Sequence, residues 1–177
     1  MISIRRFGFC GVNSIMKKRI LLFILLIIIA IQSGCSLVSN DSVMKARKSS
    51  NDVLAFLESK DTDKLRSLFC DKIHADYLEL DEDIETAMMF FQGNILSHDN
   101  PLYNESESIR NGEYVKYSVS PSIHEIKTDA GKTYHIIYYY TVVNTDYPES
   151  VGISEIMIKD ENGETCKIGD YHLVNPE

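Results

Sequence analysis

The stretch KTYHIIYYYTVVN, residues 132–144, decides the fold of this chain. It contains no Gly or Pro and is rich in the β-branched and aromatic residues that strands favour. Successive side chains of a strand point to opposite faces, so Tyr138 and Tyr140 share one face and Tyr139 lies on the other. Because the face of Tyr138 and Tyr140 is the more apolar one, we expect it to be turned to the core.

Further strands are expected around this one. Apolar and polar residues alternate over residues 113–127, where Pro121 predicts a bulge or an edge position because proline donates no ladder hydrogen bond. Residues 150–160 and 164–173 flank Asn162-Gly163, a dipeptide typical of hairpin turns. The sequence therefore predicts a meander of about four long antiparallel strands.

Three helices are expected before the sheet. Apolar residues at helical spacing predict the first over residues 42–59. Asp61 is expected to cap the second helix, and Asp81 to cap the third over residues 82–92. Residues 94–111 contain several turn signals and are expected to form an irregular connection. Helices that precede an antiparallel sheet in this way pack on one side of it, so the predicted fold class is α+β with two layers.

With this order of elements, residues 43–173 resemble the nuclear-transport-factor-2-like fold, which is also called cystatin-like. The closing residues 166–173, Cys-Lys-Ile-Gly-Asp-Tyr-His-Leu, are similar to the closing strand of many such domains. The resemblance implies that the N-terminal helices pack into the concave side of a strongly curved sheet and form a cone with it. It supplies no catalytic residue, because this fold carries enzymes, binding proteins and assembly modules alike.

The N-terminal region carries the strongest signal for localisation. Residues 16–35 begin Met-Lys-Lys-Arg, continue with the apolar residues 20–31 and end Gln-Ser-Gly-Cys, which are the parts of a secretory signal peptide. The apolar run is shorter than the roughly 20 residues that span a bilayer. Ser33-Gly34-Cys35 resembles the lipobox of bacterial lipoproteins, and the whole chain resembles uncharacterised lipoproteins of Gram-positive bacteria. The resemblance implies cleavage before Cys35 and a lipid on its thiol.

These signals predict three segments. Residues 1–34 are the leader, with Met16 as an alternative start. Residues 35–41 are a lipidated tether, and residues 42–177 form a single domain of the nuclear-transport-factor-2-like type. We expect the lipid on Cys35 to hold this domain on the extracytoplasmic face of the cell membrane.

Charge excludes one class of partner. Residues 1–34 hold five basic residues and no acid, so the remaining chain has 13 basic and 26 acidic residues. This negative field repels nucleic acids, so we expect no nucleic-acid partner. The sequence also lacks the spacings that hold zinc, phosphates or dinucleotides, so we expect no metal and no cofactor.

The expected function is non-catalytic binding of a small ligand or a protein. Tyr138 and Tyr140 are the candidate pocket residues, since tyrosines on the concave face could line a ligand site. The alternative is that these aromatic side chains fill the cone. A dimerisation module that pairs through the exposed sheet face is another reading.

The main alternative to a non-catalytic binding protein is an enzyme, isomerase-like or hydrolytic, with a pocket in the cone. Isomerases of the resembled fold place an Asp or His base near Tyr donors in the cone, and Asp76 and His74 are residues of these types. We expect no catalytic residue as the leading interpretation. Cys70 and Cys166 are left open as a disulfide or as two separate thiols.

Overall fold

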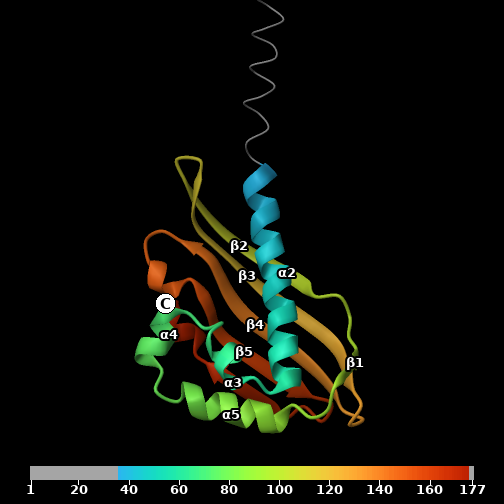
Figure 1. The fold of residues 1–177 in the computed structure, drawn as a ribbon. Helices are drawn as coiled ribbons and strands as arrows, with labels where there is room; N and C mark the ends of the chain where they lie inside the picture. Colours follow the sequence, from blue (N-terminus) through green and yellow to red (C-terminus); the bar gives the residue numbers. More distant parts are fainter. Residues whose placement is uncertain (1–35, 176–177) are drawn as a thin grey trace, which may run out of the picture. The chain divides into compact units, whose positions relative to one another are not determined.

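The computed structural model describes residues 36–175, and a compact unit of the chain begins at Ser42. In this unit, the helices that precede the sheet pack on one face of an open antiparallel sheet, which confirms the predicted α+β class (Figure 1). The leader and Cys35 lie outside the described residues. We refer below to the helix-covered face of the sheet and to its outer face.

The helices lie close to their expected positions. They are α2 (Ser36–Ser59), α3 (Thr62–Arg66), α4 (Asp71–Asp76) and α5 (Leu80–Phe90), with a short α6 (Tyr171–Val174) after the sheet. Residues 36–41 of the predicted tether are helical and belong to α2. These residues are polar enough for a tether but contain no Gly or Pro, so nothing in them ends the helix.

The two predicted helix caps have different outcomes. Asp61 caps α3 as expected, and its Oδ1 accepts a hydrogen bond from the Lys64 amide at 3.0 Å. The prediction for Asp81 is wrong, because Glu79 is the N-cap of α5 and Asp81 lies in the first turn. The helix begins earlier because Leu80 is buried in the core. The acidic first turn still interacts favourably with the helix dipole.

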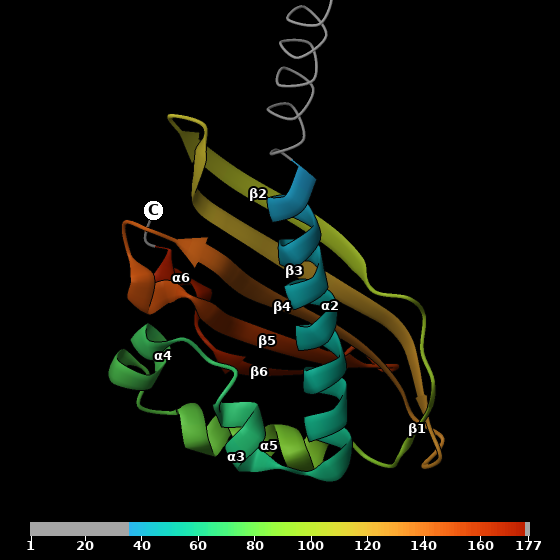
Figure 2. The same ribbon diagram turned by 45° about the horizontal axis from the view of Figure 1, so that its top comes forward.

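The sheet has six strands in the described part of the chain, which corrects the expected number of about four. Both β1 and β2 pair with β3, and β4, β5 and β6 follow in order (Figure 2). All neighbours are antiparallel. The strands are β1 (Ile95–Ser97), β2 (Leu102–Arg110), β3 (Glu113–Thr128), β4 (Thr133–Asn144), β5 (Gly152–Asp160) and β6 (Thr165–Gly169).

The two additional strands come from residues 94–111, which were expected to be irregular. Strand β2 is an edge strand, and all of its residues except Tyr103 are exposed. An exposed strand needs no alternation of apolar and polar residues, so periodicity does not reveal it. The turn signal itself is correct, because Asn111 and Gly112 have φ values of 56° and 83° and connect β2 to β3.

Pro121 is neither at an edge nor in a bulge, so that prediction is wrong. It lies inside β3, between β2 and β4, and pairs with Tyr103 in an unbroken register. The shifts in register between β3 and β4 fall at Tyr117/Ser118 and between Ile123 and Ile126. An antiparallel residue offers its N–H to one neighbour only, so this proline removes a single ladder bond from a 16-residue strand.

The final strand is shorter than expected. It ends at Gly169, which has a φ of +80° and lies so close to Ser154 that a Cβ would be 2.4 Å from the Ser154 carbonyl oxygen. Asp170 then caps α6 by accepting a hydrogen bond from the His172 amide at 2.9 Å. Residues 171–173, predicted as strand, are therefore helical.

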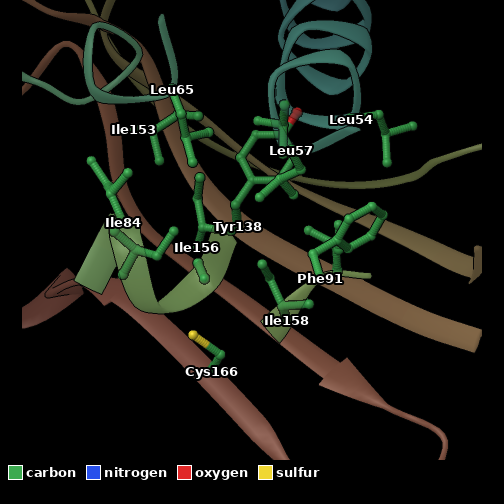
Figure 3. Packing of buried hydrophobic residues seen from close by; sticks show 14 of the residues in the cluster. Leu54, Leu57, Leu65, Ile84, Phe91, Tyr138, Ile153, Ile156, Ile158 and Cys166 are labelled. Atoms are coloured by element: carbon green, nitrogen blue, oxygen red, sulfur yellow. The ribbon is translucent and has the colours of Figure 1, made fainter. Parts of the chain in front are cut away.

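The core lies between the helices and the helix-covered face of the sheet. Figure 3 shows Tyr138 among Leu57 of α2, Ile156 of β5 and Phe91. Each of these four side chains is fully buried. The prediction that Tyr138 faces the core is confirmed by this packing.

Candidate functional site

Tyr138 fills the core and is closed off by α2. Its hydroxyl lies 2.8 Å from Ser49 Oγ and 2.8 Å from Ser50 Oγ, and both serines are buried. Burial strongly raises the pKa of the Tyr138 hydroxyl, which the two serine hydrogen bonds only partly offset. This hydroxyl therefore stays protonated and is committed to the protein itself.

Tyr140 is two residues further along β4 and lies in a different environment. Its side chain is partly buried and lines an open hollow of about 500 Å³ between α2 and the start of β5. We call this space the helix-side hollow. Within the described residues, the Tyr140 hydroxyl makes no hydrogen bond, so its donor and acceptor are available to a ligand. Burial raises the pKa of Tyr140, and Lys45 and Lys48 lower it by smaller amounts.

The helix-side hollow has an apolar side and a polar side. Leu68, Phe69 and Ile153 supply apolar surface, where the segment before α4 meets the start of β5. The polar side comes from α2, where Lys48 Nζ lies 2.9 Å from Asp52 Oδ2. An apolar wall with a few polar groups is typical of small-molecule sites.

Two backbone hydrogen bonds hold the apolar wall in place. The Ile153 amide donates to the Leu68 carbonyl, and the Cys70 amide donates to the Ile153 carbonyl, both at 2.9 Å. Gly152 makes this approach possible, because a Cβ at its position would lie 2.8 Å from both the nitrogen and the Cα of Cys70. Its φ of +131° also suits glycine.

Sequence reasoning did not identify most residues of this hollow. On α2, residues Lys45, Lys48, Ser49 and Asp52 all line it. Their spacing of three or four residues places them on one face of a helix, so a polar stripe was present in the sequence. Phe69 and Ile153 carry no such signal, because only the tertiary fold brings them together.

The candidate bases of the enzyme alternative lie elsewhere. His74 and Asp76 are on α4, which packs against α6 and residues 148–150, and neither lines the helix-side hollow. Asp76 is bound to Lys72 at 2.5 Å. Helix α5 is joined to β4 by Tyr134, whose hydroxyl donates to the Phe90 carbonyl at 2.9 Å.

Two histidines form a cluster on the outer face. The rings of His124 and His135 are stacked with centroids 3.9 Å apart, and both Nε2 atoms contact Ser122 Oγ, at 2.9 and 2.8 Å. One hydroxyl hydrogen can serve only one ring, so the other ring donates its Nε2–H to Ser122. No group of three or more metal-binding side chains occurs in the described residues.

Cys70 and Cys166 are separate buried thiols, which decides the alternative left open by the sequence. Burial raises the pKa of both thiols. Neither is therefore activated as a nucleophile.

The predicted lipid-attachment residue, Cys35, lies before the described part of the chain. None of the described helices is long and apolar enough to cross a membrane.

Comparison with known proteins gives one family. The model of a domain of unknown function, DUF5104, matches residues 52–162, from the second half of α2 to the turn after β5. No curated protein matches the chain. Since the family model covers more than half of the sequence and includes most of the helix-side hollow, the chain belongs to the DUF5104 family.

Proposed function

We propose that this protein is a lipoprotein anchored to the extracytoplasmic face of the cell membrane through Cys35. Its domain binds a small ligand in the helix-side hollow and does not catalyse a reaction. The signal peptide and the Ser33-Gly34-Cys35 sequence support the anchor. We further propose that the domain is of the nuclear-transport-factor-2-like type, which the order of helices and strands and the helix-covered sheet support.

The contrast between Tyr138 and Tyr140 carries the binding proposal. Both tyrosines lie on the helix-covered side of β4, but the Tyr138 hydroxyl is bound by Ser49 and Ser50. The Tyr140 hydroxyl lines an open hollow and makes no bond to a described residue. A partly buried hydroxyl at the wall of a hollow gains a hydrogen-bond partner when a ligand enters.

The walls indicate the chemistry of the ligand. Phe69 and Ile153 offer apolar surface, so the ligand has an apolar body. Tyr140 offers one donor and acceptor, so the ligand carries a polar group on one side. Two cations, Lys45 and Lys48, and two acids, Asp52 and Asp71, line the hollow. Lys48 pairs with Asp52 and the formal charges balance, so no net charge is required of the ligand.

The same ion pair supports a binding role over a catalytic one. A general base must reach the substrate with its carboxylate. Of the two acids that line the hollow, Asp52 is held by Lys48, and Asp71 is exposed to solvent in the first turn of α4, where no burial sets it apart from an ordinary surface carboxylate.

Native mass spectrometry of the full chain, purified from membranes in a nonionic detergent, tests the binding proposal. We expect a small molecule to copurify with the wild-type protein, and Tyr140→Phe to lower its occupancy several-fold by removing one hydrogen bond. Tyr139→Phe is the matched control, because Tyr139 lies on the neighbouring, outward position of β4. Absence of any bound small molecule, or equal occupancy in both variants, would contradict the proposal.

A further inference from the structure

A second open space lies at one end of the sheet and shares no lining residue with the helix-side hollow. It has a volume of about 580 Å³ and lies between the β2–β3 hairpin, the β4–β5 connection, α4 and α6. We call it the end groove. Figure 1 shows two of the elements that border it, α4 and the β4–β5 connection, close together at one end of the sheet.

Cations outnumber acids by one among the residues that line the end groove, although the chain after the leader has twice as many acids as bases. Three cations line it, from α4, β2 and β3, against two acids from the β4–β5 connection. Two of these cations are paired with carboxylates: Lys72 with Asp76 at 2.5 Å and Arg110 with Asp146 at 3.1 Å.

Lys116 is the cation of the groove that makes no ion pair with a carboxylate of residues 36–175. Its Nζ donates to the side-chain oxygen of Asn175 at 2.5 Å, and this amide is neutral. An ammonium has three donors, so two remain for other acceptors. The Lys116 side chain is partly buried, which strengthens its interaction with an anion relative to that of a lysine in bulk water.

The register of the sheet places a second donor beside Lys116. Ser108 of β2 is directly opposite Lys116, and Asn144 of β4 is opposite it on the other side. Directly opposite residues point to the same face with Cβ atoms roughly 5 Å apart. Ser108 and Lys116 can therefore bind the two oxygens of one carboxylate. Asn144 is committed elsewhere, since its amide donates to Ser150 Oγ at 2.8 Å.

Apolar side chains complete the groove. Leu173 and Val174 of α6 and Val115 of β3 line it beside the polar groups. We propose that the end groove binds a small organic carboxylate, with the carboxylate on Lys116 and Ser108 and an apolar body against α6. The end groove shares no lining residue with the helix-side hollow. The proposal for the end groove can therefore be tested separately from the function proposed above.

Titration calorimetry on the full chain in a nonionic detergent tests this site. The probes are N-acetyl-L-leucine and N-acetyl-L-leucine amide, which differ only in the charge of one group. We expect the carboxylate to bind at least about tenfold more tightly than the amide. We expect this preference to narrow as salt is raised, because part of it is electrostatic.

Two lysine variants assign the effect. Lys116→Met keeps the apolar stem and removes the charge, so it abolishes the preference for the carboxylate, whereas Lys116→Arg retains it. Lys127→Met is the matched control on the same strand, where Lys127 lies 3.5 Å from Glu125 and outside the groove. The inference is overturned if the two probes bind wild type equally, if neither binds at about 10 mM, or if Lys116→Met behaves as Lys127→Met does. If Lys116→Met does not fold, the wild-type protein alone decides: a preference for the carboxylate over the amide that stays unchanged at high salt overturns the inference.

Discussion

Tyr138 connects the sheet to α2, and its removal provides a quantitative test of the core. Tyr138→Ala deletes a fully buried aromatic side chain, for which we expect a loss of about 3–5 kcal/mol in the free energy of unfolding. Tyr138→Phe keeps the ring and removes only the hydroxyl. We expect it to cost about 1–2 kcal/mol, because Ser49 and Ser50 lose a buried partner.

The smaller value for Tyr138→Phe comes from the hydrogen bonds that remain. Ser49 Oγ and Ser50 Oγ each also donate to the Ala46 carbonyl, at 2.8 and 3.1 Å. The hydroxyls of Ser49, Ser50 and Tyr138 together have three hydrogens for four hydrogen-bond contacts, so one hydrogen is shared between two acceptors. After the tyrosine hydroxyl is removed, both serines still have an acceptor, and neither is left without a hydrogen bond.

Urea unfolding of the chain from Ser36 onward, followed by circular dichroism, measures these losses. We expect a cooperative transition with helix and strand signals that disappear together. The coupling between Tyr138→Phe and Ser50→Ala in a double-mutant cycle reports the contact across the two layers.

Tyr139→Ala is the control for the face assignment. Its side chain is 37% exposed and its ring lies 4.5 Å from that of Tyr171, so we expect a loss of only about 1 kcal/mol. If Tyr138→Ala costs no more than Tyr139→Ala, the packing of β4 against α2 described above is wrong.

Three further predictions follow from the anchor, the bridge before α4 and the histidine cluster. Cys35→Ala should abolish palmitate labelling and release the protein from the membrane fraction; a variant that stays labelled and sedimentable contradicts the anchor. Gly152→Ala should destabilise the domain by at least about 2 kcal/mol in urea unfolding, because its Cβ meets the Cys70 backbone; a loss below about 0.5 kcal/mol contradicts that contact. Burial, more than its charged neighbours, lowers the pKa of His135 below its ordinary value of 6.5. As pH falls, the His135 side chain is therefore protonated in the unfolded chain before it is protonated in the folded one, and the free energy of unfolding should fall as pH drops below about 6.5. His135→Gln should make the free energy of unfolding less dependent on pH in this range. An unchanged slope in the variant contradicts this prediction.

The sequence predicted those parts of the fold that local patterns determine. The residues 132–144 gave β4, with Tyr138 inside and Tyr139 outside, because alternation of burial follows directly from strand geometry. Asp61 was identified as a cap for the same local reason. Strand β2 could not be found, since its exposed edge position removes the apolar alternation on which the prediction depended.

The candidate site was predicted only in part, for a related reason. Tyr140 was identified because it lies on the apolar face of a strand, and Tyr138 was proposed with it on the same pattern. Periodicity cannot separate these two residues, because their difference depends on what α2 places above each of them. Above Tyr138 it places Ser49 and Ser50, which bind the hydroxyl, whereas Tyr140 faces the hollow beside the Lys48–Asp52 pair.

The apolar wall of the hollow shows why long-range contacts decide where a site forms. Phe69 and Ile153 are brought together by a parallel bridge between segments that belong to no common strand pair. This bridge requires a residue without Cβ at position 152, since any other residue would collide with the backbone at Cys70. A single glycine therefore fixes the approach of β5 to the start of α4 and, through it, the space that Tyr140 faces. Because neither Gly152 nor Phe69 belongs to a sequence motif, this dependence becomes visible only in the folded chain.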